Sequence, residues 1–183
     1  MAKSDKGEVL FMVGPMGSGK STVGRHLAEL LGYGFIDSDS EVEARAGADI
    51  PWIFDIEGEA GFRRREAAVL RDLANKRHVV IATGGGAILA EQNRQVMAVK
   101  GLVIFLNVSV AQQLKRTGSG DGRPLLQTGD RERTLKRLMA ERGPLYSALA
   151  DVMISGSEGN VRKVAQHIQT QLYERGLISS YTD

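Results

Sequence analysis

The stretch Gly14-Pro15-Met16-Gly17-Ser18-Gly19-Lys20-Ser21 decides the fold of this chain, because it matches the pattern G-x-x-x-x-G-K-[ST] at every fixed position. The apolar run Val9–Val13 comes before it and is typical of a buried strand. Apolar residues at helical spacing come after it, namely Val23, Leu27, Leu30 and Leu31. A strand, a glycine-rich loop and a helix in this order predict a phosphate-binding loop, in which backbone N–H groups and the helix N-terminus face phosphate oxygens. In such a loop the ammonium of Lys20 contacts the outer phosphates and the hydroxyl of Ser21 ligates Mg²⁺.

Length and composition set the limits for the rest of the chain. Its 183 residues fit one domain over 1–183, with room for a small inserted lid. The absence of cysteine excludes a disulfide framework and a thiolate metal site, and it suits a cytoplasmic protein. No apolar run approaches the roughly 20 residues that span a bilayer, and we expect no membrane partner. A net charge of +2, with five Phe and four Tyr, argues against nucleic acid as a partner.

Five apolar runs that resemble strands alternate with helical patterns along the chain. Because these runs are apolar throughout, they predict a parallel sheet with helices on both faces, hence an α/β fold. We expect a flexible arm over 1–7 and a flexible tail over 178–183. The runs are Val9–Val13, Phe35–Ile36, Val79–Ala82, Leu102–Leu106 and Val152–Ile154.

One segment resists assignment to a helix or a strand. Thr117–Pro124 contains three glycines and a proline, and the irregular composition continues to Gly129. A passive surface loop would explain it, but a long irregular loop in a small domain is more often a lid or binding loop. We therefore predict a mobile lid over about 117–130.

Functional candidates gather where the predicted strands end, since parallel sheets of this kind bind ligands beyond the carboxyl ends of their strands. Asp37 and Asp39 follow the second run, and we expect them to lie on an extended segment, one facing a metal ion and the other the acceptor. The alternative is that Asp37 or Ser38 only caps a helix that begins near Glu41. The glycines Gly84–Gly86 follow the third run and would let a substrate approach backbone amides.

Arginines supply the remaining candidates. Arg63, Arg64 and Arg65 are consecutive in a helical stretch and cannot share one face, so the pattern leaves open which of them turns inward. Arg142 lies where another helical pattern is expected to end, and there it could merely bind terminal carbonyl groups.

Taken together, these motifs resemble the shikimate kinase family from about Leu10 to Ile168. The order of the motifs is specific, although the phosphate-binding loop alone is shared by many families. They are Gly14–Ser21, Asp37-Ser38-Asp39, Phe62-Arg63-Arg64 with Glu66, Gly84-Gly85-Gly86-Ala87, Arg116-Thr117-Gly118, Arg123-Pro124-Leu125-Leu126 and Arg142-Gly143-Pro144-Leu145-Tyr146.

The resemblance implies a fold and a reaction. Family members have a five-stranded parallel sheet of order 2-3-1-4-5, similar to nucleoside monophosphate kinases. They transfer the γ-phosphoryl group of ATP to the 3-hydroxyl of shikimate in the pathway to chorismate and aromatic amino acids. We expect a monomer whose small-molecule partners are shikimate and ATP.

The resemblance also implies the role of each site residue. Lys20, Asp39 and Arg123 are implied to be catalytic, and Ser21 with Asp37 to serve Mg²⁺. ATP is implied to contact Gly14, Gly17, Ser18, Gly19, Lys20, Ser21, Thr22, Arg116 (against the adenine) and Arg123. Shikimate is implied to contact Asp39, Arg63, Gly84, Gly85, Gly86 and Arg142.

Three other functions agree less well with these motifs. Another small-molecule kinase, such as a gluconate kinase, fits less well with the acidic pair, the arginines and the triple glycine. A GTPase switch would need an Asn-Lys-x-Asp signature, but Asn75-Lys76-Arg77-His78 lacks the Asp and comes before a strand. A non-catalytic nucleotide-binding module would not require Lys20, Ser21 and both acids together.

Overall fold

The computed structural model describes residues 5–118, 130–156 and 160–179. Five parallel strands form one sheet in the order β2-β3-β1-β4-β5, as the family resemblance implied. The strands are β1 (Val9–Val13), β2 (Gly34–Asp37), β3 (Val79–Ala82), β4 (Leu102–Asn107) and β5 (Val152–Ser155). Each predicted run therefore forms a strand, with bounds that differ by a residue at most.

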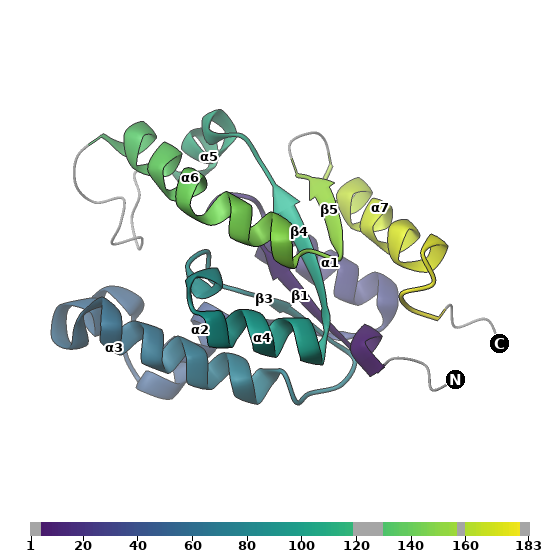
Figure 1. The fold of residues 1–183 in the computed structure, drawn as a ribbon, viewed down its shortest axis with the longest axis horizontal. Helices are drawn as coiled ribbons and strands as arrows, with labels where there is room; N and C mark the ends of the chain where they lie inside the picture. The colour runs from purple at the N-terminus through teal and green to yellow at the C-terminus, as the bar shows by residue number, and fades with distance from the viewer. Residues whose placement is uncertain (1–4, 119–129, 157–159, 180–183) are drawn as a thin grey trace.

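Helices cover both faces of this sheet (Figure 1). They are α1 (Lys20–Leu31), α2 (Ser38–Ala46), α3 (Ile50–Leu73), α4 (Glu91–Lys100), α5 (Val110–Thr117), α6 (Arg131–Leu149) and α7 (Val161–Glu174), with short 3-10 helices η1 (Asp5–Glu8) and η2 (Ala87–Leu89). None of the helices in the described ranges is long and apolar enough to cross a membrane.

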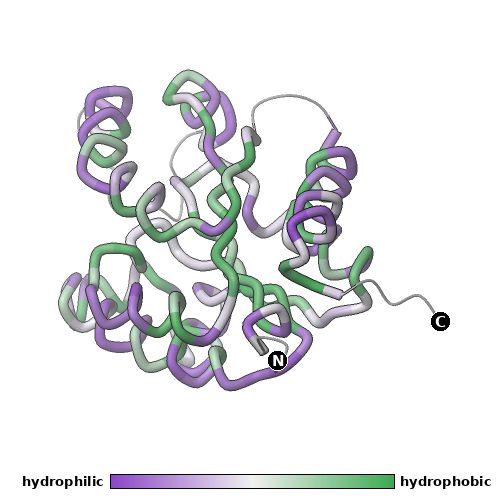
Figure 2. Tube along the Cα trace, turned by 45° about the vertical axis from the view of Figure 1, so that its right-hand side comes forward, coloured by the Kyte–Doolittle hydropathy of each residue, from purple (hydrophilic) through white to green (hydrophobic). Residues whose placement is uncertain are grey.

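The core is divided in two because successive strand residues point to opposite faces. Phe11 of β1 faces one cluster, which includes residues of α3, α4 and α6. Met12 faces the other, which includes residues of α1 and α7. Figure 2 shows the resulting arrangement, with hydrophobic strands at the centre and hydrophilic stretches on the outer helices. The sheet is thus buried on both faces, as its apolar strands predicted.

Residues of the expected arm and tail contact the rest of the domain. Within the arm, the carbonyl oxygen of Gly7 accepts a hydrogen bond from the hydroxyl of Tyr33, and Lys6 binds the carbonyl oxygen of Ala98. Ile178 packs against the core at the start of the tail. Residues 1–4 and 180–183 lie outside the described residues, as do 119–129 of the expected lid.

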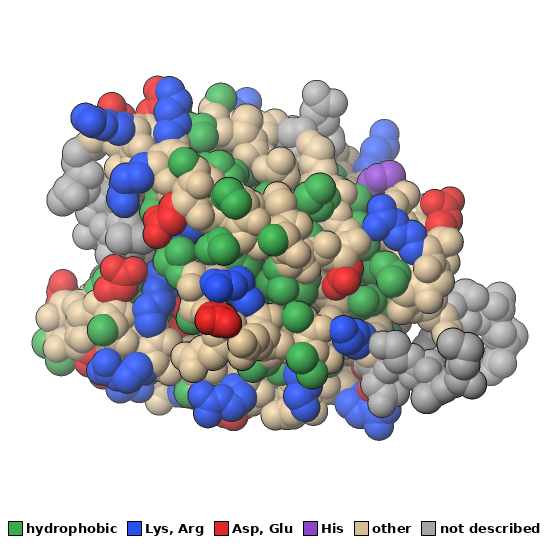
Figure 3. Space-filling model, in the orientation of Figure 1, with side chains coloured by type: hydrophobic (Ala, Val, Ile, Leu, Met, Phe, Trp, Pro, Cys, Tyr) green, Lys and Arg blue, Asp and Glu red, His purple; other side chains and the backbone are tan. Residues whose placement is uncertain are grey.

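Charged side chains of both signs are interspersed over the face seen in Figure 3, and no single basic patch dominates that face. This distribution agrees with the small net charge of +2.

Candidate active site

The phosphate-binding loop joins the end of β1 to the start of α1, and its glycines are needed for its conformation. Gly17 and Gly19 have positive φ angles of 75° and 89°. Gly14 has a φ of 148°, and a Cβ there would lie 2.5 Å from the carbonyl oxygen of Leu106. Side chains at these positions would strain or obstruct the turn, so the loop presents backbone to its ligand.

Lys20 is the first residue of α1, and its side chain folds back over the loop. Its Nζ donates to the carbonyl oxygens of Gly14 at 2.8 Å and Pro15 at 2.9 Å, and it lies 3.4 Å from Oγ of Ser18. The ammonium is therefore held at the loop, where phosphate oxygens would be bound.

Asp37 connects the loop with α2. One carboxylate oxygen caps α2 by accepting hydrogen bonds from the amides of Asp39 at 2.9 Å and Ser40 at 3.2 Å. The other accepts a hydrogen bond from the hydroxyl of Ser21. Asp37 thus caps α2, as the alternative proposed, and at the same time contacts Ser21 of the phosphate-binding loop. The predicted extended segment was wrong, because α2 begins at Ser38 and places Asp39 in its first turn.

The pair of Ser21 and Asp37 fits Mg²⁺, which usually binds one or two protein oxygens together with water and substrate phosphates. In the ranges that the structure describes, no group of three or more His, Cys, Asp or Glu residues could hold a metal ion by itself. A metal bound here would have to share its coordination with phosphate, as the adjacent loop allows.

Charged side chains lie close to the triple glycine after β3, where a side chain on these residues would otherwise be. A Cβ at Gly84 would lie 2.7 Å from Oδ1 of Asp39 and 2.8 Å from Oε1 of Glu66. The backbone of Gly84 is fixed by the hydroxyl of Ser38, which accepts its N–H at 3.2 Å. Two carboxylates thus meet at one glycine.

The other two glycines border arginines. A Cβ at Gly86 would collide with the guanidinium of Arg63, and one at Gly85 would lie 3.6 Å from Nη1 of Arg142. The backbone of the three glycines therefore lies close to four charged side chains from α2, α3 and α6. These side chains come together at this edge of the sheet. The sequence predicted that Gly84–Gly86 would let a substrate approach bare backbone. In the structure, the neighbouring charged side chains also occupy space that larger residues at these positions would need.

Several polar atoms of this charged cluster are buried without a hydrogen-bond partner within the described residues. They are Oδ1 of Asp39, Nε of Arg63, Oε1 of Glu66 and Nε of Arg142. Leaving a buried polar atom unpaired costs free energy, so a group of them in one place indicates a polar ligand.

Burial also changes the acidity of the two carboxyl groups. It raises the pKa of Asp39 to about 6, and the charge of Asp37 raises it further while Lys20 and Arg63 lower it. Burial likewise raises the pKa of Glu66 to about 7, against the lowering influence of Arg63. Asp39 is therefore a carboxyl group with an acidity suited to accepting a proton near neutral pH.

The structure settles which of the three consecutive arginines turns inward. Nη1 of Arg63 lies 2.8 Å from Oε2 of the buried Glu66. Arg64 is exposed, and Arg65 pairs with Glu57 at 2.6 Å on the outer surface. Periodicity was ambiguous here because α3 is interrupted at Gly58, where φ is 70° and ψ is 178°.

Arg142 does not end a helix, contrary to the expectation from the sequence. α6 continues to Leu149 with Pro144 in its interior, so Arg142 lies in mid-helix and has no terminal carbonyl groups to satisfy. Its side chain is buried, with 5% of its surface exposed. The alternative role at a helix end is therefore excluded.

A cleft of about 700 Å³ runs along this edge of the sheet. Met16–Val23, Asp37, Asp39, Gly84 and Gly85 line it, together with Arg116, Gly156, Val161 and Val164. It brings together the loop, Thr22 included, and the acidic pair. Gly86 is not among the residues that line the cleft, and Arg63 and Arg142 lie beside the triple glycine without lining the cleft itself.

Arg116 closes the far side of the cleft. Its guanidinium donates to the carbonyl oxygens of Gly17 at 3.3 Å, Ser18 at 3.4 Å and Gly156 at 2.9 Å. It thereby joins the phosphate-binding loop to the segment that follows β5. Arg123, predicted to reach the phosphates, lies outside the described residues.

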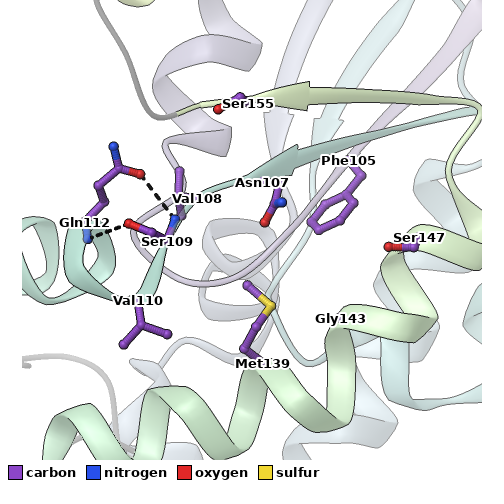
Figure 4. A pocket seen from close by; sticks show the side chains of 10 residues that line it. All are labelled: Phe105, Asn107, Val108, Ser109, Val110, Gln112, Met139, Gly143, Ser147 and Ser155. Atoms are coloured by element: carbon purple, nitrogen blue, oxygen red, sulfur yellow. Dashed lines mark hydrogen bonds between the residues drawn. The ribbon is translucent and has the colours of Figure 1, made fainter.

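A second groove, of about 520 Å³, lies between the end of β4, α5 and α6 (Figure 4). No charged side chain is among its ten lining residues, which include Phe105, Asn107 and Met139. It therefore lacks the cationic groups that form strong, charge-assisted hydrogen bonds with phosphate or carboxylate ligands, and the charged cleft remains the candidate active site.

Comparison with known proteins agrees with this site. A family model described as shikimate kinase matches residues 16–173. The chain belongs to the shikimate kinase family. A shikimate kinase from Halorhodospira halophila is 55% identical over 159 residues, which cover 87% of this chain and 90% of the relative. One from Vibrio parahaemolyticus is 47% identical over 91% of this chain and 96% of the relative.

Solved structures confirm the fold. A shikimate kinase from Acinetobacter baumannii, determined in complex with shikimate, superposes with a TM-score of 0.92 at 46% identity, covering 95% of this chain and 97% of that one. The enzyme from Aquifex aeolicus gives a TM-score of 0.81 at 38% identity over 92% and 98%. The chain is accordingly an ATP-dependent shikimate kinase, as its motifs indicated.

Two residues in the site received no role from the sequence. Glu66 was part of the family motif, but only the structure shows that it is buried and pairs with Arg63. Tyr146 also belonged to a motif, and its hydroxyl lies 2.5 Å from the carbonyl oxygen of Gly85. A charged or hydroxyl-bearing residue inside an apolar helix face was the signal that could have found them.

Proposed function

We propose that the cleft binds ATP over the phosphate-binding loop and shikimate beside the triple glycine, and transfers the γ-phosphoryl group to the 3-hydroxyl. The observation that carries this division is the cluster of unpaired buried polar atoms on Asp39, Arg63, Glu66 and Arg142, next to a loop that suits phosphates. Shikimate has a carboxylate and three hydroxyl groups, which match arginine donors and a carboxylate acceptor.

Each charged side chain has a distinct role in this proposal. Arg63 and Arg142 pair with the shikimate carboxylate, while Asp39 accepts a hydrogen bond, and then the proton, from the attacking hydroxyl. Lys20 stabilises the negative charge on the transferring phosphoryl oxygens. Mg²⁺, held by Ser21 with Asp37 in support, would neutralise phosphate charge when bound.

The remaining assignments concern the nucleotide and the setting. Arg116 borders the end of the cleft where Val161 and Val164 offer apolar surface, which supports a place for the adenine there. We infer that the protein acts as a monomer. We also infer a cytoplasmic enzyme.

Replacing Arg63 by alanine is expected to weaken shikimate binding about ten- to a hundred-fold, since a charge-assisted hydrogen bond contributes about 1.5–3 kcal/mol. The Kd for ATP should change much less. Calorimetric titration of each ligand into folded protein measures both. The matched control is Arg64→Ala, because Arg64 is exposed on the same turn. Equal losses in the two variants would contradict the assignment of Arg63.

The raised pKa values predict opposite responses of activity and stability to pH. kcat/KM for shikimate should rise as pH increases through about 6, because Asp39 must lose its proton to act as a base. The free energy of unfolding should instead fall as pH rises from about 4.5 to about 7, because the folded state holds Asp39 and Glu66 at raised pKa values.

Steady-state kinetics and denaturant titration across this pH range measure the two responses. Since neighbouring carboxyl groups titrate as a pair, the apparent pKa values belong to the cluster. Replacing Asp39 by asparagine should reduce the pH dependence of stability. If the free energy of unfolding of Asp39→Asn falls with pH as steeply as that of the unmodified protein, Asp39 does not cause the pH dependence of stability.

A further inference from the structure

Tyr146 is the largest fully buried side chain of the described core, and it lies one helical turn beyond Arg142 on α6. Its ring stacks on Phe105 of β4, with ring centroids 5.1 Å apart and an angle of 29° between the planes. Phe105 also lines the uncharged groove, where Figure 4 shows its ring. Helix, strand and ring contacts together fix the position of the Tyr146 hydroxyl.

That hydroxyl reaches the glycine backbone of the proposed shikimate site. It donates a hydrogen bond of 2.5 Å to the carbonyl oxygen of Gly85. Burial raises the pKa of Tyr146 to about 12, while Arg142 lowers it. The hydroxyl therefore stays protonated at neutral pH and can donate to Gly85.

The carbonyl of Gly85 determines the direction of the next amide. In a trans peptide the C=O of one residue and the N–H of the next point to opposite sides. Because Tyr146 holds the Gly85 carbonyl, the Gly86 N–H is directed away from Tyr146. Neither the Gly85 nor the Gly86 amide donates a hydrogen bond within the ranges described, and glycine backbone has little intrinsic restriction.

We propose that Tyr146 is a positioning residue for the acceptor half of the site, where its hydroxyl fixes the Gly85–Gly86 peptide in the orientation that binds shikimate. This inference rests on the proposed function, which places shikimate beside Gly85 and Gly86 and its carboxylate at Arg142. Tyr146 itself is behind the glycine backbone, so it acts through these groups.

The test removes one oxygen atom, in Tyr146→Phe, which keeps the ring and its stacking on Phe105. We expect KM and Kd for shikimate to rise about five- to twenty-fold, as for the loss of one buried hydrogen bond. KM for ATP should stay within about two-fold, because the phosphate-binding loop is untouched. In NMR spectra of isotope-labelled protein, the backbone amide resonance of Gly86 should shift relative to the unmodified protein.

Tyr33→Phe is the matched control. Its hydroxyl also donates to a glycine carbonyl, that of Gly7 at 3.0 Å, but at the opposite end of the sheet from the cleft. It should lower the thermal midpoint without changing KM for either substrate. An unchanged shikimate KM in folded Tyr146→Phe, or equal increases for shikimate and ATP, would overturn the positioning role.

A third variant distinguishes a wrong role for Tyr146 from a wrongly placed shikimate site. Arg142→Ala should weaken shikimate binding whether or not Tyr146 acts on the glycines. If Arg142→Ala loses shikimate affinity and Tyr146→Phe does not, the positioning role alone is wrong. If neither variant loses affinity, the shikimate site is wrongly placed and the inference about Tyr146 fails with it.

Discussion

Replacing Lys20 by alanine is expected to lower kcat by about 100- to 1000-fold, the cost of removing one preorganised charge from a transition state. Lys20 supplies this charge at the phosphate-binding loop, where its Nζ is held by the carbonyl oxygens of Gly14 and Pro15. The side chain is only partly buried, so the thermal midpoint should change little. Steady-state assay of ADP release, together with thermal unfolding, measures both effects.

Lys6→Ala provides a matched control for this prediction. Lys6 also donates to a backbone carbonyl oxygen, that of Ala98 at 2.6 Å, but it lies at the edge of the sheet opposite the cleft. Its replacement should leave kcat unchanged. A folded Lys20→Ala protein with near-normal turnover would show that the phosphoryl group is stabilised elsewhere.

Asp39→Asn is expected to lower kcat by about 100- to 10,000-fold, the range that a general base contributes. Shikimate binding should weaken as well, because asparagine can no longer accept a hydrogen bond at both positions. Stability should not fall, since the change removes a buried carboxyl group with a raised pKa. Titrations with shikimate and with Mg²⁺ in single-turnover assays separate the effects.

Asp37→Asn is the partner experiment, because Asp37 differs from Asp39 in its contacts. It bonds to Ser21 and caps α2, so its replacement should raise the Mg²⁺ concentration needed for half-maximal activity. Shikimate affinity should be affected less than in Asp39→Asn. If both variants show the same defects in metal and shikimate dependence, the two acids do not have separate roles.

Much of the fold could be predicted because its signals are local. The loop Gly14–Ser21 requires specific residue types at fixed positions, and the apolar runs form strands because a parallel sheet is buried on both faces. The strand order came from the family resemblance, since apolar runs do not specify their neighbours. The rule that ligands bind beyond the strand ends correctly brought Asp37 and Gly84 to one edge.

The errors arose where tertiary structure overrides local preference. Arg142-Gly143-Pro144 has the composition of a helix end, yet α6 continues through it. Proline in a helix interior removes one backbone hydrogen bond, and packing of Leu145 and Tyr146 against the core stabilises the continued helix. Similarly, Asp37 caps α2 earlier than the pattern suggested, which moves Asp39 from an extended segment into a helix.

The charged cluster could not be predicted by spacing alone. Arg63 and Glu66 are three residues apart on α3, which is also the spacing of an ordinary surface ion pair. Only the tertiary arrangement shows that Gly84 and Gly86 make room for them, and that Glu66 is almost completely buried. In the sequence, only the combination of several distant motifs indicates this charged cluster, because each motif is weak by itself.

The most direct test of the account is ADP release by the purified protein with ATP and Mg²⁺, measured with shikimate, with gluconate and without an acceptor. We expect rapid release with shikimate and only slow background release in the other two reactions, with shikimate 3-phosphate formed in equal amount to ADP. Equal rates with and without shikimate, or faster release with gluconate, would contradict it.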